Sequence, residues 1–429
     1  MYRHLPRRCL NLSTVRCLSP AAEEYERTTA EFMDRVFVAA GDIFANQLTM
    51  LDLIERKAKA DPDAEQYIFQ GESFTRGWIS DRINQTAHAL GEVGLEPGDY
   101  CAVMAPNSPD FITNVYGCAS GGVTPALINT SMTGHALKHC IEVADAKALL
   151  IDESMEEAVD QLKLNIPIIS NGKNYGLGHT DSLINKQPTA RPDHRPGPMD
   201  EFALIYTSGT TGLPKAAVKK HMQPCLTGYI ADWTYDFDEK ESLMLLTLPL
   251  FHFSGLLHTC IPFGTGGKLL LEPKFSASRS VQLMKDYPVS HFIYIGELIR
   301  YINEVPPRPD DKDIPLKQIC GNGLNTAEWV KFTERFGTNV HVAEVYGASE
   351  LPTVIKDNAK GCTTPGAFGI LTPNLRETMG IRLVKFDEET QQPVRNADGF
   401  LIECGTDEPG ICVMKTTEVF AFSGYHGKV

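Results

Sequence analysis

Strand-like apolar runs alternate with helical patterns along most of this 429-residue chain, and this alternation limits its fold more than any other feature. In the first part, helical patterns cover Leu51–Lys59, Thr75–Gly94 and Pro109–Gly122, and strand patterns cover Asp99–Met104 and Ala126–Ile128. Strands separated by helices pair in parallel, because the helices serve as crossover connections between them. The sequence therefore predicts an α/β fold with mostly parallel sheets.

A second α/β series follows a proline-rich connection, Gln187–Pro198, that suits neither a helix nor a central strand. Its strand candidates are Ser242–Leu246, Lys268–Leu271, His291–Ile295, Gln318–Cys320 and His341–Val345. From Ile381 onward the apolar runs are shorter and turn residues separate them, which predicts a small β-rich part. We therefore expect a first α/β subdomain over residues 23–198, a second over 199–380 and a β-rich subdomain over 381–429.

The charge balance excludes one broad class of function. The chain has a formal net charge of -14 and no basic stripe, so we do not expect a nucleic-acid partner. Its 11 cysteines show no paired metal-ligand spacing and an odd count, which favours reduced thiols in the core. Because 42% of the residues are hydrophobic, the chain has enough apolar material for two or three domains.

An apolar stretch without Asp, Glu, Lys or Arg, Met244–Gly264, is long enough for one membrane crossing. It also contains two prolines and two glycines, so we expect a buried strand, a loop and the start of a helix instead. Residues 1–22 form a basic arm that carries Arg3, Arg7, Arg8 and Arg16. Two interpretations of this arm stay open, a mitochondrial targeting segment and a plain N-terminal extension.

A polar loop follows the strand pattern at Phe202–Tyr206, at a strand's carboxyl end, where α/β proteins usually bind ligands. It consists of Thr207, Ser208, Gly209, Thr210, Thr211, Gly212, Leu213, Pro214 and Lys215. Its glycines let backbone N–H groups converge on an anion, its hydroxyls donate hydrogen bonds, and Lys215 adds a positive charge. These properties predict a phosphate-binding loop, and the alternative is a polar turn between a strand and a helix.

Two more groups of polar residues come directly after strand patterns. They are Gly321, Asn322 and Gly323 after one strand, and Tyr346, Gly347, Ser349 and Glu350 after another. A carboxylate such as that of Glu350 suits Mg²⁺, which takes oxygen ligands while it bridges phosphates. Each group alone is also typical of a tight turn, so its meaning depends on partnership with the phosphate loop.

The phosphate loop is similar, nearly letter for letter, to the signature of the adenylate-forming, acyl-activating enzymes. Tyr346–Glu350 resembles a second signature element of that family. Gly321–Gly337, Leu248–His252 and Ala126–Asn129 resemble the fatty-acid transport branch of its acyl-CoA synthetases. The resemblance covers nearly the whole chain and implies the large N-terminal part of such an enzyme, with two stacked α/β subdomains.

The resemblance also implies roles for the candidate residues. Those at the ATP phosphates are Thr207, Ser208, Gly209, Thr210, Thr211, Gly212 and Lys215, and those near the adenosine and the α-phosphate are Gly321, Asn322, Gly323, Tyr346, Gly347 and Ser349. Glu350 with Thr211 would hold Mg²⁺, and Lys215 and Glu350 would serve catalysis. His252 is carried over as an acyl-side or gating residue, and a satisfied core histidine is the alternative.

The implied activity is that of a fatty-acyl-CoA ligase, with ATP, a fatty acid and CoA as substrates. The relatives continue past Val429 with a ribose-binding aspartate, a hinge and a mobile domain that carries a catalytic lysine. The alternative is therefore a non-catalytic acyl- or ATP-binding form that partners full-length relatives. Leu351 and Pro352 replace a small polar pair of the branch, which puts the shape of the acyl pocket in question. We also expect an intracellular homodimer, with peripheral contact to the endoplasmic reticulum or another membrane.

Overall fold

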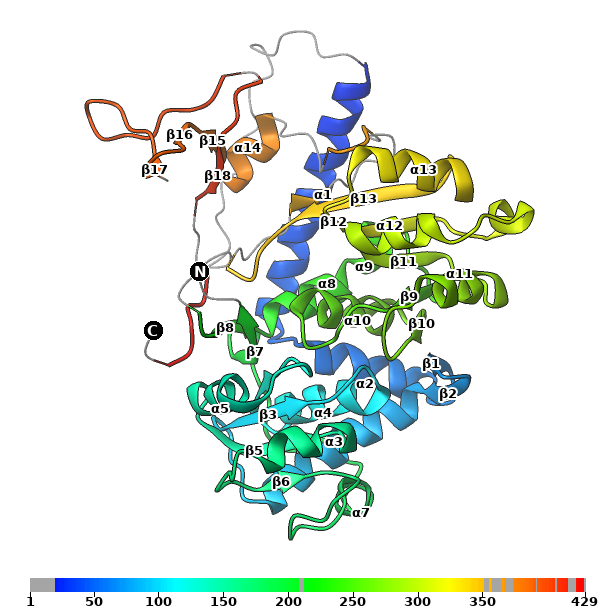
Figure 1. Ribbon diagram of the computed structural model, residues 1–429, viewed down its shortest axis with the longest axis vertical. Coiled ribbons are helices and arrows are strands. Elements are labelled where there is room, and N and C mark those ends of the chain that lie inside the picture. Colours follow the sequence, from blue (N-terminus) through cyan, green and yellow to red (C-terminus); the bar gives the residue numbers. More distant parts are fainter. Residues whose placement is uncertain are drawn as a thin grey trace.

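The computed structural model describes residues 20–207, 212–350, 355–356, 364–367, 373–390, 392–405, 407–415 and 422–427. Two β-sheets are stacked, with a layer of helices between them and further helices on their outer faces (Figure 1). Small antiparallel strand pairs complete the chain. The predicted α/β class, with two stacked parts and a small β-rich part, is confirmed.

The first sheet has six strands, and every neighbouring pair is parallel except the last. In order across the sheet, these strands are β6 (Ile168–Ile169), β5 (Ala146–Ile151), β3 (Tyr100–Met104), β4 (Thr124–Leu127), β7 (Glu201–Thr207) and β8 (Lys215–Lys220). Because β8 returns antiparallel to β7, the predicted phosphate loop connects two strands of a hairpin. A turn from a strand into a helix, the alternative reading of this loop, is therefore wrong.

The second sheet has eight strands, parallel in its centre and antiparallel at both edges. In order, they are β14 (Ile355–Lys356), β13 (His341–Tyr346), β12 (Gln318–Asn322), β11 (His291–Ile295), β9 (Leu243–Leu246), β10 (Lys268–Leu271), β1 (Glu65–Phe69) and β2 (Glu72–Thr75). The hairpin of β1 and β2 precedes residue 198, whereas β7 and β8 follow it and belong to the first sheet. The expected boundary at residue 198 therefore does not coincide with the division between the sheets.

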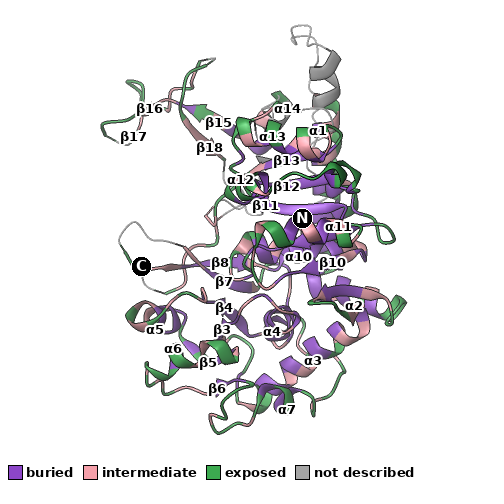
Figure 2. Cartoon of the chain, turned by 45° about the vertical axis from the view of Figure 1, so that its right-hand side comes forward, coloured by how far each residue is buried: buried purple, intermediate pink, exposed green. Residues whose placement is uncertain are grey.

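Five helices form the layer between the sheets, where most of the core lies. They are α2 (Met50–Ala60), α3 (Arg76–Glu92), α4 (Pro109–Ser120), α8 (Met222–Tyr229) and α10 (Phe253–Thr265). Their apolar faces share one buried cluster with residues of both sheets, among them Phe202 of β7 and Leu246 of β9. Burial is accordingly densest on the strands and on these helices, while exposed residues gather on the outer elements (Figure 2).

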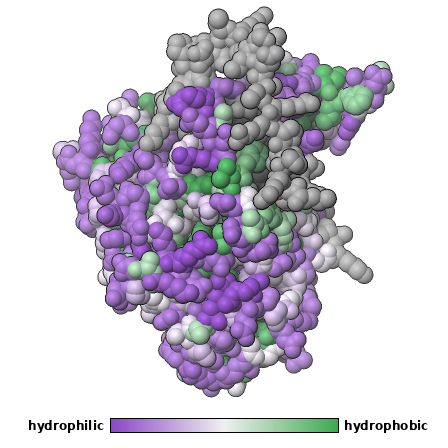
Figure 3. All heavy atoms as spheres, turned by 180° about the vertical axis from the view of Figure 1, so that it is seen from behind, coloured by the Kyte–Doolittle hydropathy of each residue, from purple (hydrophilic) through white to green (hydrophobic). Residues whose placement is uncertain are grey.

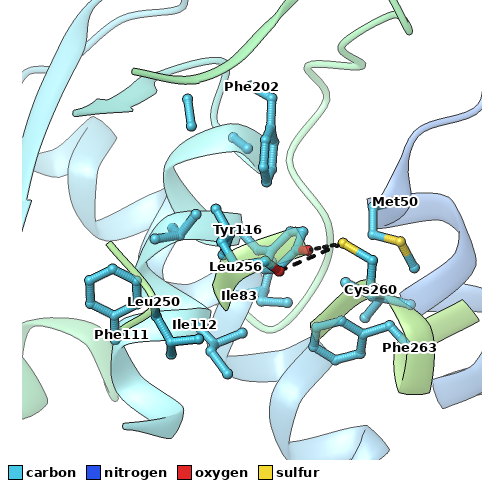
Figure 4. Close-up of a cluster of buried hydrophobic side chains, with 14 of the residues drawn as sticks. Met50, Ile83, Phe111, Ile112, Tyr116, Phe202, Leu250, Leu256, Cys260 and Phe263 are labelled. Carbon is cyan, nitrogen blue, oxygen red and sulfur yellow. Dashed lines mark hydrogen bonds between the residues drawn. The ribbon is translucent and has the colours of Figure 1, made fainter. Parts of the chain in front are cut away.

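Aromatic and sulfur-containing side chains fill the centre of this layer. The Tyr116 hydroxyl of α4 lies 3.2 Å from Cys260 Sγ of α10, and the Tyr116 and Phe263 ring centroids are 5.5 Å apart (Figure 4). Burial raises the pKa of Cys260 to about 12, so this thiol stays protonated. The cysteines of the described residues are all free thiols, as the scattered spacing predicts.

The outer faces of the sheets are covered by separate sets of helices. On the first sheet these are α5 (Gly134–Val143) and α6 (Glu156–Asp160), with α7 (Thr180–Ile184) beside α3. On the second sheet they are α11 (Ala277–Asp286), α12 (Gly296–Glu304) and α13 (Thr326–Phe336). On the face seen in Figure 3, hydrophilic residues dominate and apolar residues form small areas.

A long N-terminal helix, which the sequence analysis did not predict, is α1 (Pro20–Ala45). It packs against α8 and against α14 (Pro373–Met379), and its Phe32 ring stacks on Trp233 of α9 (Ala231–Tyr235), with centroids 5.4 Å apart. The small strand pairs join β15 (Ile381–Val384) to β18 (Ile411–Met414) and β16 (Phe386–Asp387) to β17 (Gln392–Pro393).

No single helix among the described residues is long and apolar enough to cross a membrane. Residues 26–45 and 50–60, bent by 86° relative to each other, reach the required length and composition only as a pair. The uncharged stretch Met244–Gly264 folds as β9, a loop and most of α10, as predicted.

The crossing of α8 and α10 yields the first testable prediction. A Cβ added to Gly264 would lie 2.0 Å from the backbone oxygen of Gly228, so Gly264→Ala forces the two helices apart. We expect a loss of about 1–3 kcal/mol in unfolding free energy, measured by urea denaturation. Gly91→Ala in α3 is the matched control, because nothing lies within 4 Å of its Cβ position. Equal unfolding midpoints for the two variants would contradict the packing argument.

Candidate active site between the two sheets

The predicted phosphate loop is held at both ends by β-sheet pairing. Thr207 is the last residue of β7, Lys215 is the first of β8, and the two are directly paired across the hairpin. The His139 ring nitrogen Nε2 lies 3.1 Å from the Pro214 carbonyl oxygen, which ties the returning arm of the loop to α5. Ser208, Gly209, Thr210 and Thr211 lie outside the described residues, so their roles stay predictions.

The Gly321–Gly323 group lies at the carboxyl end of β12, beside the ends of β11 and β13. A Cβ on Gly321 would lie 2.1 Å from the Tyr294 backbone oxygen of β11, so a side chain has no room there. Asn322 is exposed at the strand end. Parallel strands end at one edge of a sheet, and this edge is therefore where polar groups from distant parts of the chain gather.

Glu344 of β13 holds this group in place, which the sequence analysis missed. Its carboxylate accepts hydrogen bonds from the backbone N–H of Gly323 at 3.1 Å, from that of Leu324 at 3.2 Å and from the Tyr294 hydroxyl at 2.6 Å. Burial raises the pKa of Glu344, although the three donors act against this rise. A carboxylate six residues before Glu350 gives no sequence signal of its own, because its partners come from β11 and from the turn that follows β12.

A cavity of about 510 Å³ opens beside these strand ends. Its walls are mainly apolar and include Ile205 of β7, Leu248 and Ile295, and Phe32 of α1 also contributes. Four predicted site residues line it, namely His252, Asn322, Gly347 and Ser349. Pockets of this size that combine apolar walls with a few polar groups are typical of small-molecule sites.

His252 precedes α10 as its N-cap residue and lies on the cavity wall rather than in the core. Desolvation lowers the pKa of its imidazole, so the ring is neutral near pH 7. The Tyr346 side chain is 47% exposed, and Tyr346 does not line the cavity. The structure thus places His252 on the wall of an apolar cavity and leaves Tyr346 outside it, and the acyl-side role of His252 stays a prediction.

Glu350 lies next to the hairpin and has an unexpected partner. The Tyr425 hydroxyl donates a hydrogen bond to its Oε1 at 2.7 Å, and the Lys215 ammonium lies 5.2 Å from the centroid of the Tyr425 ring. Burial raises the pKa of Glu350. The Tyr425 and Thr207 hydroxyls and the charge of Lys219 lower this pKa by more than burial raises it, so the net shift is downward. Glu350 is therefore an ionised carboxylate that faces the phosphate loop.

Tyr425 reaches this position because the C-terminal segment Phe422–Gly427 pairs with β8. The His426 N–H donates to the Ala216 oxygen at 2.8 Å, and the Val218 N–H donates to the Gly424 oxygen at 3.1 Å. The segment thus runs along the free edge of β8, antiparallel to it. No spacing rule connects Tyr425 with a residue 75 positions earlier, which explains why sequence reasoning missed it.

Lys219 is a second residue that the sequence analysis missed. Its ammonium donates to the Ser349 backbone oxygen at 2.6 Å and lies 4.4 Å from the centroid of the Phe253 ring. Desolvation lowers the pKa of Lys219 to about 8, and the charge of Glu350 opposes this shift. The ammonium is therefore still protonated at pH 7, although it is buried.

Solved structures of other proteins have the same architecture. The anthranilate CoA ligase AuaEII, in complex with anthranoyl-AMP, superposes with a TM-score of 0.76 at 20% identity, over 91% of this chain and 73% of that one. The N-terminal domain of FACL13 from Mycobacterium tuberculosis superposes with a TM-score of 0.70 at 20% identity, over 89% of this chain and 91% of that one. The fold, with its two stacked sheets and the hairpin of β7 and β8 at the edge of the first, is that of the large N-terminal part of adenylate-forming enzymes.

The family follows from the sequence match. Residues 54–425 match the family described as AMP-binding enzyme, and the chain belongs to that family. Long-chain fatty acid transport protein 6 of Mus musculus is 30% identical over 396 residues, which cover 89% of this chain and 62% of that protein. The chain thus spans about three fifths of the length of this curated relative.

The anchoring role of Glu344 yields the second prediction. Glu344→Ala leaves the buried Leu324 N–H, the partly buried Gly323 N–H and the buried Tyr294 hydroxyl without their acceptor, which costs about 1–3 kcal/mol of unfolding free energy. Glu334→Ala, at an exposed position of α13, should change it by less than about 0.5 kcal/mol. Urea denaturation of both variants measures the difference. If Glu344→Ala unfolds at the wild-type midpoint, the carboxylate does not hold the loop.

Proposed function

We propose that this protein activates an aliphatic carboxylic acid with ATP, as a fatty-acyl-CoA ligase does. The carrying observation is that Ser349 lines the apolar cavity, while the next residue, Glu350, is hydrogen-bonded to the Thr207 hydroxyl at the start of the predicted phosphate loop. Thr207 is paired with Lys215 across the hairpin. Such a cavity suits an alkyl chain, because each buried CH₂ group contributes about 0.8 kcal/mol. The name of the mouse relative points to long-chain fatty acids.

The proposed reaction has two steps. First, a carboxylate oxygen of the acid bonds to the α-phosphorus of ATP, the bond to the bridging oxygen of the β-phosphate breaks, and pyrophosphate leaves. Second, the CoA sulfur bonds to the acyl carbon, the bond to the AMP oxygen breaks, AMP leaves, and the thiol proton passes to solvent. The structure solved with anthranoyl-AMP contains a product of the same kind of first step.

The residues of this chain contribute binding and charge. Lys215 and the Thr207 hydroxyl, fixed by the hairpin, would meet the phosphate oxygens, and the wall at Asn322 would face the adenine. Preorganised cations and N–H donors of this kind stabilise charge that develops in a transition state. The apolar walls would keep water from the reacting carboxylate.

Magnesium fits the donor set at Glu350. The carboxylate is ionised, and it is hydrogen-bonded to Thr207 at the start of the predicted phosphate loop. A Mg²⁺ ion held there would take its remaining oxygen ligands from phosphates and water. When bound there, Mg²⁺ would withdraw negative charge from the phosphate oxygens. Glu350 is the described residue that would hold it, and Thr211 stays the second candidate.

The third prediction concerns pyrophosphate release. With ATP, Mg²⁺ and a fatty acid, the wild-type chain should release pyrophosphate in an acid-dependent manner, and Lys215→Ala should reduce the rate on the order of 10²-fold. Lys220→Ala is the matched control, because Lys220 lies on the same strand and its Nζ is 3.7 Å from Glu201 Oε1, away from the site. A coupled pyrophosphate assay measures all three proteins.

The outcome also separates this function from its alternative. If the wild-type chain binds ATP and fatty acid but releases no more pyrophosphate than Lys215→Ala, ligase activity is rejected. A non-catalytic acyl- and ATP-binding protein, which partners full-length relatives, would then be the better description. Equal loss of activity in Lys215→Ala and Lys220→Ala would instead remove Lys215 from the proposed site.

A further inference from the structure

Lys219 combines a positive charge with almost complete burial. Its residue surface is 2% exposed, and within the described part of the chain it forms no ion pair. Its hydrogen-bond acceptor is the Ser349 backbone oxygen, at 2.6 Å. Lys220, the next residue, has the usual arrangement of an accessible lysine beside a carboxylate.

Burial is energetically demanding for an ammonium group that makes no ion pair, although the charge of Glu350 offsets part of the cost. Removing it from water costs hydration free energy that one carbonyl oxygen and the Phe253 ring restore only in part. An ammonium has three N–H donors, so this one retains donor capacity beyond the bond to Ser349. An anionic oxygen is the acceptor that forms the strongest bond with such a group.

The position of Lys219 shows where that oxygen would come from. Cross-strand pairing places Ile205 opposite Ala217 and Ala203 opposite Lys219, so Ile205 and Lys219 project from the same face of the hairpin. That face meets the helical layer, and Ile205 lines the apolar cavity. Phe253 and Ser349, which the ammonium contacts, line the same cavity.

We propose that Lys219 binds the carboxylate of the acid substrate at the end of the cavity bounded by Phe253 and Ser349. This inference rests on the proposed acid-activating function and adds the group that orients the acid. The alkyl chain would extend into the apolar cavity, and its carboxylate would stop beside Glu350 and the phosphate loop. Lys219 is thus a substrate-positioning residue that selects a carboxylate over an uncharged head group.

A phosphate of ATP is the other anionic oxygen within the site, and the geometry favours the carboxylate. Lys215 lies at the end of the predicted phosphate loop, whereas Lys219 lies four residues further along β8, against the cavity walls. Under this proposal, Lys215 at the start of β8 contacts the phosphates, and Lys219 near its end contacts the carboxylate of the acid. Nucleotide affinity and acid affinity should respond to different lysines.

The fourth prediction compares dodecanoate with 1-dodecanol, which have the same chain length and differ in the head group. At pH 7, wild type and the control Lys220→Met should bind dodecanoate on the order of 10-fold or more tightly than dodecanol. Lys219→Met should bring the two affinities within about threefold, without weakening dodecanol or MgATP binding. Isothermal titration calorimetry measures each pair, and a MgATP thermal shift reports on the nucleotide site.

A measurement on the wild type alone keeps the idea testable if Lys219→Met does not fold. Dodecylammonium places a cation against Lys219, so the expected order of affinity is dodecanoate, then dodecanol, then dodecylammonium. Equal affinity for dodecanoate and dodecanol in the wild type, or an unchanged preference in Lys219→Met, would overturn the role of Lys219 and leave the acyl cavity in place. Loss of MgATP binding alone in Lys219→Met would assign the residue to a phosphate. A wild type that binds neither alkyl ligand would instead reject the proposed function.

Discussion

The antiparallel pairing of β7 with β8 is the interaction on which the candidate site depends. It closes the predicted phosphate loop by placing Thr207 opposite Lys215. It also places Ile205 on the cavity wall and Lys219 against Phe253 and Ser349, which line the same cavity. Its free edge accepts the segment that carries Tyr425. One hairpin therefore sets the positions of Thr207, Lys215 and Lys219, and its edge holds the segment whose Tyr425 contacts Glu350.

The hairpin belongs to one sheet, whereas Asn322 ends a strand of the other sheet and Glu350 follows one, so the candidate site depends on how the two sheets are stacked. Close-packed helices provide this, because at the crossing of α8 and α10 a side chain on Gly264 would have no room. Buried Asn107, which follows β3 of the first sheet, adds a polar link to the second. Its side chain donates to the Leu248 oxygen at 2.9 Å and the Glu272 oxygen at 3.1 Å, and it accepts from the Leu250 N–H at 2.8 Å.

The sequence predicted those parts of the fold that depend on local patterns. The helices at Met50–Ala60 and Arg76–Glu92 and the central strands agree with prediction, because their apolar periodicity and capping residues are contained within each segment. The assignment of β1, β2, β7 and β8 to sheets could not be predicted, since the pairing of Tyr67 with Leu269 joins residues about two hundred positions apart. For the same reason, motif reading found Asn322, Ser349 and Glu350 but missed Glu344, Lys219 and Tyr425. Their partners come from other strands or from the C-terminal segment.

Tyr425 and Lys219, which belong to no sequence motif, both help to determine the charge of Glu350. Glu350 is kept ionised by the hydroxyls of Tyr425 and Thr207 and by the nearby charge of Lys219, so the carboxylate exists before any ligand arrives. The Tyr425 hydroxyl uses one acceptor position of Oε1, and a carboxylate has about four such positions, so Glu350 can still accept a further donor or a cation. The ring of Tyr425 also lies against the Lys215 ammonium, with 5.2 Å between the nitrogen and the ring centroid. The C-terminal segment therefore brings one aromatic residue against a carboxylate and a lysine that come from different sheets.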